Sequence, residues 1–165
     1  VLDRPLRPVR GPFQLAYSEI DLPLADPPPR AQIEQDAAAE NPFVRNRAKF
    51  YLKLLDEGQP LPKSLPISLA VLRLGEDLTF FAMGGEPVVD YGRRIKRLFA
   101  ADHPWTIGYA YDIPFYVPTA RVIVEGGYEA DSSLIYANLY GPFRTQVEDI
   151  LVGKITELAG AVRGK

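Results

Sequence analysis

Residues 83–87, Met-Gly-Gly-Glu-Pro, contain a side chain that could do chemistry. An apolar run ends here in two glycines and a carboxylate, directly before a predicted helix. A glycine junction between a strand and a helix places its side chains at the carboxyl edge of a sheet, where α/β proteins usually build their sites. Glu86 is therefore a candidate functional carboxylate. The alternative is that Glu86 caps the helix, where the N-terminal dipole favours its charge.

Residues 108–119 form a second candidate segment. They include Tyr109, Tyr111, Asp112 and Tyr116, together with two prolines. A rigid, aromatic and hydrogen-bonding loop of this kind often lines a ligand pocket, although well-packed structural loops have the same composition. The glycine pair in residues 125–129 lacks the spacing of a phosphate-binding loop, so no nucleotide site is predicted.

Composition excludes several classes of function. The chain has no cysteine and one histidine, His103, so thiolate catalysis is excluded and a complete zinc site of the usual residue types is hard to assemble. The formal net charge is −2 and no basic cluster interleaves with aromatic residues, so nucleic acid is not an expected partner. No apolar run approaches the roughly 20 residues of a transmembrane helix.

The elements that must position these segments alternate between strands and helices. Asn41 and Pro42 begin a helix, as N-cap and first helical residue, and Gly75 with Asp77 supplies the turn of a hairpin. Leu15, Tyr17 and Ile20 are the imperfectly spaced apolar anchors of an edge strand. The predicted strands are 15–22, 67–74, 78–83, 105–111 and 134–139, and the predicted helices are 31–39, 42–57, 88–100, 118–124 and 147–159.

This order predicts an α/β fold, with a small mixed sheet flanked by helices and an extended proline-rich N-terminal arm. We expect residues 1–29 to form an extended connector and the edge strand, and residues 30–165 to form the α/β domain. The arm begins without an initiator Met and is rich in proline, as a connector from an upstream domain would be. The interpretation we favour is a connector that leaves an upstream domain, and the alternative is a disordered terminal tail.

Four stretches, taken in order, resemble the neutral ceramidase family, especially its shorter bacterial relatives. The first contains Gly-Pro-Phe and Ile-Asp-Leu-Pro-Leu, the second contains Gly-Gly-Glu-Pro followed by Gly-Arg-Arg, the third is the tyrosine-rich loop, and the last contains Tyr-Gly-Pro-Phe. Together they span most of the chain, and their ordered spacing is more specific than any one motif. They lie at residues 10–24, 83–97, 108–119 and 125–129, the last with residues 140–143 and the pair Val147 and Glu148.

The resemblance implies that the chain is the C-terminal part of a larger α/β hydrolase domain. It also implies a zinc site that is shared between two halves of the protein. In that family two histidines come from the amino-terminal half, and a glutamate and a tyrosine come from the carboxy-terminal half. The matching positions here are Glu86, ahead of Gly92 and Arg93, and Tyr116, in the element Tyr-Val-Pro-Thr. Glu86 and Tyr116 are thus the expected metal ligands, and Tyr116 is also the expected catalytic residue, as a donor to the oxyanion.

The implied activity is zinc-dependent hydrolysis of the N-acyl bond of a ceramide-like lipid, and the family's habit suggests a secreted or periplasmic protein. The two family histidines and the upstream serine have no counterpart here. We therefore expect the chain to need its upstream half or a partner chain, and to expose an apolar face where that half is missing. The alternative is a non-catalytic α/β binding or scaffold domain. Glu86 and Tyr116 facing one cleft would favour the amidase.

Overall fold

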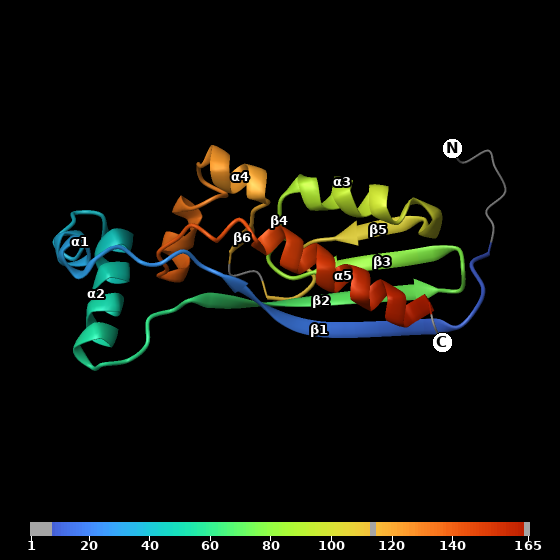
Figure 1. Ribbon diagram of the computed structural model, residues 1–165, viewed down its shortest axis with the longest axis horizontal. Helices are drawn as coiled ribbons and strands as arrows, with labels where there is room; N and C mark the ends of the chain where they lie inside the picture. The colour runs from blue at the N-terminus through green and yellow to red at the C-terminus, as the bar shows by residue number, and fades with distance from the viewer. Residues whose placement is uncertain (1–7, 113–114, 164–165) are drawn as a thin grey trace.

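The computed structural model describes residues 8–112 and 115–163, and its centre is a four-stranded sheet in the order β1-β2-β3-β5 (Figure 1). The long edge strand β1 (Phe13–Pro23) pairs antiparallel with β2 (Ser64–Leu74) along its whole length. A tight turn at Gly75, whose φ is 56°, leads into β3 (Leu78–Met83). The last strand, β5 (Pro104–Ile107), is parallel to β3. The predicted edge strand, hairpin and mixed sheet are thus confirmed.

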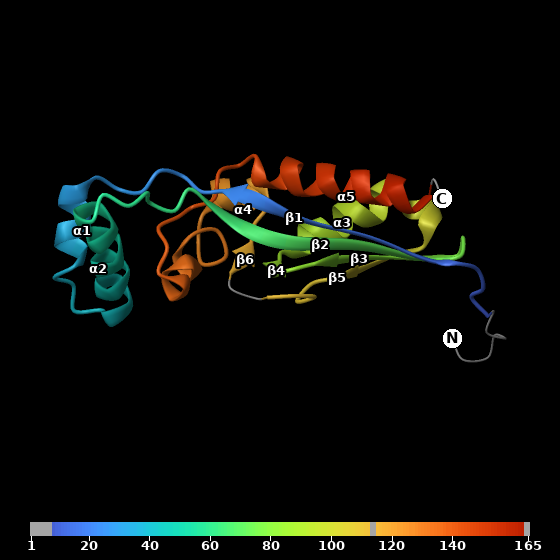
Figure 2. The same ribbon diagram turned by 90° about the horizontal axis from the view of Figure 1, so that it is seen from below.

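Two helices cover one face of this sheet. The crossover between β3 and β5 contains α3 (Val89–Leu98), which packs on β5, and α5 (Val147–Arg163) packs on β1 and β2 (Figure 2). The apolar positions of α5 recur every three or four residues, so they form one stripe directed at the sheet. The buried positions of this stripe are Val147, Leu151, Ile155, Leu158 and Val162.

The opposite face of the sheet, called the open face below, carries no helix among the described residues (Figure 2). Phe13, Leu15 and Tyr17 point to it from β1 and are 60%, 55% and 53% exposed. The intervening Ala16 and Ile20 pack against the core beneath the helices. These side chains form an exposed apolar surface, and the expectation that a missing upstream half would cover it stays a prediction.

A helical hairpin lies beyond one end of the sheet (Figures 1 and 2). It consists of α1 (Arg30–Asp36) and α2 (Pro42–Asp56), and it has a small core of its own. As predicted, Pro42 is the first residue of α2 and the Asn41 side chain accepts a hydrogen bond of 2.9 Å from the Phe43 amide. The fully buried side chains of this core are those of Ile33, Ala48 and Tyr51, with Tyr140 contributed from downstream.

Several predicted elements were wrong or shifted. The predicted strand 134–139 is the 3-10 helix η2 (Ser132–Ala137), because its backbone finds local partners, with the Leu134 amide donating to Asp131 and the Asn138 amide donating to Ile135. A short buried apolar run has no periodicity that separates a strand from a helix. The predicted strand 105–111 ends at Ile107, since Tyr109 has a φ of 56° and turns the chain.

The remaining elements are short. The expected helix near 118–124 is α4 (Ala120–Glu125), and the 3-10 helix η1 (Ala100–Asp102) follows α3. Residues 1–7 of the predicted arm lie outside the described residues. No helix in the described part of the chain is long and apolar enough to cross a membrane.

Candidate functional site

Two strands of two residues each meet beyond the carboxyl end of β3. They are β4 (Glu86–Pro87) and β6 (Tyr116–Val117), which run parallel with Glu86 paired to Tyr116. The Glu86 amide donates to the Phe115 carbonyl at 3.0 Å, and the Val88 amide donates to Val117 at 3.1 Å. The two residues expected to bind the metal are therefore direct neighbours, held by backbone hydrogen bonds.

Gly85 makes this close approach possible. Its φ is 65°, a left-handed conformation that only glycine adopts without strain. A Cβ atom here would lie 2.8 Å from Val117 Cγ2 and 3.1 Å from the Phe115 carbonyl oxygen. Gly85 also donates to the Asp112 carbonyl at 2.8 Å and accepts from the Tyr109 amide at 3.0 Å. The Gly-Gly junction thus draws the tyrosine loop against the end of β3.

Two phenols meet the Glu86 carboxylate. The hydrogen bond to Glu86, with partial desolvation and the charge of the carboxylate, raises the pKa of Tyr116 to about 12. The pKa of Tyr109 is also raised, and its largest cause is the hydrogen bond to the same carboxylate. Both phenols therefore keep their protons at neutral pH and donate to Glu86. The Tyr116 ring also packs edge-on against Tyr128, with ring centroids 5.5 Å apart.

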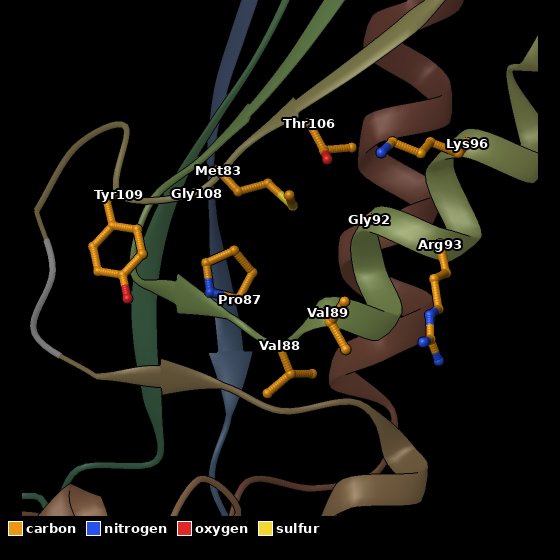
Figure 3. A pocket seen from close by; sticks show the side chains of 10 residues that line it. All are labelled: Met83, Pro87, Val88, Val89, Gly92, Arg93, Lys96, Thr106, Gly108 and Tyr109. Carbon is orange, nitrogen blue, oxygen red and sulfur yellow. The ribbon is translucent and has the colours of Figure 1, made fainter.

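Shallow clefts lie on either side of β4. Glu86 and Tyr116 line one cleft of about 420 Å³, together with Arg121, Glu125 and Glu129. Tyr109 lines the other, of about 260 Å³, between β4, α3 and the end of β5 (Figure 3). Glu86 and Tyr116 therefore line the same cleft.

Glu86 does not cap the following helix. The residue at the N-cap position of α3 is Val88, and no side chain makes a capping hydrogen bond there. The carboxylate instead accepts hydrogen bonds from Tyr109 and Tyr116. The capping interpretation is therefore wrong.

Charged side chains fix the three helices around Tyr116. Asp90 at the start of α3 pairs with Arg121 of α4 at 2.6 Å, and this guanidinium, foremost through its hydrogen bond, lowers the pKa of Asp90. Glu148 at the start of α5 pairs with Arg94 at 2.6 Å and accepts a hydrogen bond of 3.0 Å from the Ala120 amide. These contacts join the beginnings of α4 and α5 to α3.

The described residues do not complete a metal site. Glu86 and Tyr116 are adjacent oxygen donors, whereas zinc in proteins takes four ligands in tetrahedral arrangement. His103 cannot be a third ligand, because it precedes Pro104, which pairs with Thr79 at the opposite end of β3. At about 3.3 Å per residue the six-residue strand β3 separates them by about 20 Å. In the described residues no group of three or more His, Asp or Glu side chains could hold a metal.

Comparisons of the chain with protein-family models, with curated proteins and with solved structures find no match. The resemblance to the ceramidases therefore rests on the sequence motifs alone.

Sequence reasoning placed Tyr109 and Tyr128 in candidate loops but gave them no role. Both belong to the site, as a hydrogen-bond donor to Glu86 and as the ring packed on Tyr116. A signal for Tyr109 was present. Tyr109 lies near the carboxyl end of the predicted strand 105–111, and parallel strands bring their carboxyl ends to one edge of a sheet.

Proposed function

We propose that this chain is the carboxy-terminal part of a zinc-dependent amide hydrolase of the neutral ceramidase type, acting on the N-acyl bond of a ceramide-like lipid. One observation carries the proposal. Glu86 and Tyr116, which come from two separate motifs of the resemblance, pair across the β4–β6 ladder and face one cleft.

The side chains of the cleft have distinct roles in this proposal. Zinc, when bound, supplies a Lewis acid that polarises the amide carbonyl. Glu86 and Tyr116 would hold it as oxygen ligands. A Tyr116 phenol that retains its proton can instead donate to the amide oxygen as negative charge develops there. Tyr109 donates to Glu86 and so orients the carboxylate, as outer hydrogen-bond partners of metal ligands do.

Two further ligands are needed, and we assign them to the upstream half of the same protein or to a partner chain. On this account the isolated chain binds zinc weakly and does not hydrolyse the substrate. The missing ligands are histidines, by the resemblance, and would approach the cleft that Glu86 and Tyr116 line.

The test compares this chain with a version extended upstream to include the two expected histidines. Zinc content and hydrolysis of N-acyl-sphingosine are measured for both, and for Glu86→Gln and Tyr116→Phe in each. We expect zinc and activity only in the extended chain, and their loss in Glu86→Gln. Glu125→Gln is the matched control, since Glu125 lines the same cleft but forms an exposed pair with Arg121.

The second candidate is a binding or scaffold domain. It is supported by the two phenols, which already satisfy the Glu86 carboxylate without a metal. Absence of zinc from both versions of the chain would favour this function and would contradict the amidase.

A further inference from the structure

The open face of the sheet is an extended apolar surface. The strand register aligns three rows of outward positions, and every position in them is apolar. The first row runs from Phe13 through Leu74 to Leu78, the second from Leu15 to Trp105, and the third from Tyr17 to Ile107. Tyr111 extends the third row, because its ring packs edge-on against Tyr17 at 5.8 Å.

The exposed fractions convert into a substantial area. Six large side chains of this face are between 39% and 62% exposed, and they are Phe13, Leu15, Tyr17, Trp105, Ile107 and Tyr111. Since each would present about 200 Å² if fully exposed, together they present about 600 Å². This is about three quarters of the roughly 800 Å² that each partner buries in a stable protein interface, and it lies at the upper end of the range for the largest apolar patch of a monomer.

Charge and topology indicate what covers this face. The outward row of β1 continues beyond Tyr17 into Glu19 and Asp21, which are both exposed. Carboxylates at this margin oppose contact with an anionic membrane. Parallel strand pairs such as β3 and β5 are normally covered on both faces, so the expected cover is a second layer of protein.

We infer that the open face binds the same face of a second copy of this chain, forming a two-fold dimer with the two sheets stacked. A two-fold interface requires a self-complementary surface, and a flat apolar sheet face satisfies this because no charge is left unpaired on burial. If the strands of the two copies run in opposite directions, the acidic margins, Glu19 and Asp21 of each copy, lie at opposite ends of the interface. The second copy then occupies the apolar face that we expected the upstream half to cover. None of the contacts involves Glu86 or Tyr116, so the dimer can fail while the proposed zinc site stands.

Trp105 reports on this contact without any mutation. It is the single tryptophan of the chain, lies on the open face and is 62% exposed. We expect light scattering to give a mass about twice 18.4 kDa, with blue-shifted tryptophan emission. On dilution the mass should halve and the emission should move to longer wavelength over the same concentration range.

Substitutions then locate the interface. Leu15→Glu and Trp105→Glu place a charge at opposite edges of the face, and each should give a monomer that retains the circular dichroism of the parent chain. Leu98→Glu is the matched control, because Leu98 is 54% exposed on α3, on the covered side of the sheet, and this variant should remain a dimer.

Because the chain has no cysteine, single-cysteine variants provide a second measurement if a charged variant fails to fold. Leu15→Cys should be cross-linked into dimers by a short bismaleimide, whereas Leu98→Cys should not. A concentrated sample that stays monomeric with long-wavelength emission would overturn the inference, as would a dimer that survives both charge substitutions. Blue-shifted emission of a monomer on uncharged phosphatidylcholine vesicles would also overturn it and would identify a lipid surface instead.

Discussion

Glu86 and Tyr116 are paired across a parallel ladder only two residues long, and the carboxylate of the first receives the phenolic hydrogen bond of the second. The ladder places an acceptor and a donor side by side at the rim of one cleft. Their coupling can be measured in the isolated chain, whether or not a metal binds there.

Glu86→Gln should lower the pKa of Tyr116 from about 12 toward the ordinary tyrosine value near 10. The carboxylate favours the protonated phenol by accepting its hydrogen and by repelling the phenolate, so its loss makes ionisation easier. The measurement is a pH titration of the tyrosine ring Cζ resonances, with the Tyr116 signal assigned from Tyr116→Phe.

Glu125→Gln is the control for this titration, because Glu125 lines the same cleft but pairs with Arg121. It should leave the titration of Tyr116 unchanged. An unaltered Tyr116 pKa in Glu86→Gln would mean that the carboxylate and the phenol do not interact in solution.

Gly85→Ala should destabilise the chain more than Gly58→Ala. Both glycines have a φ of 65°, so both substitutions add backbone strain of about 1–2 kcal/mol. The new methyl group at Gly85 also meets Val117 and Phe115, whereas nothing lies within 4 Å at Gly58. Urea denaturation should give the larger loss of unfolding free energy for Gly85→Ala. Equal losses would show that β6 can move to make room for the methyl group at little cost.

The sequence predicted the parts of this site that depend on local chemistry. The Gly-Gly junction and the proline after it located Glu86 at the end of a strand, and the Tyr-Val-Pro-Thr motif located Tyr116. The β4–β6 ladder itself could not be predicted. Strands of two residues have no periodicity, and their pairing is a contact between distant segments.

In the sequence, the only sign of the open face was the irregular spacing of the apolar residues in β1. Leu15 and Tyr17 face outward, whereas Ile20 packs against the covered core, so the apolar residues of β1 lie on both faces. A strand with apolar residues on both faces loses the simple alternation of a half-buried strand. The imperfect spacing of these apolar residues is therefore what a sheet with two apolar faces produces.

Arg121→Gln should raise the pKa of Asp90 toward its ordinary value of 3.8. The pairing lowers the Asp90 pKa in the folded state, so its contribution to stability is present above about pH 4 and is lost as the pH falls through the lowered value. A carboxyl-carbon titration should detect the shift, and the fall in the urea midpoint between pH 5 and pH 2 should be smaller in the variant.

Arg97→Gln serves as the control for Asp90, because it removes one exposed guanidinium from the same helix, α3. It should change neither the Asp90 titration nor the fall in the urea midpoint between pH 5 and pH 2. An Asp90 pKa that stays low in Arg121→Gln would assign the shift to other groups, Thr119 and Arg93 among them.

Glu148→Gln should cost about 1–3 kcal/mol of unfolding free energy, the range for a lost charge-assisted hydrogen bond at a partly buried site. Its carboxylate is 19% exposed and bridges Arg94 and the Ala120 amide, so the substitution leaves the Arg94 guanidinium without its closest counter-charge. The neighbouring Asp149 also pairs with Arg94 but is 81% exposed, where such pairs contribute little. Urea denaturation of Glu148→Gln and Asp149→Asn should therefore give clearly unequal losses. Similar small losses would mean that Arg94 does not join α3 to α5, and that packing of α5 on the sheet positions these helices instead.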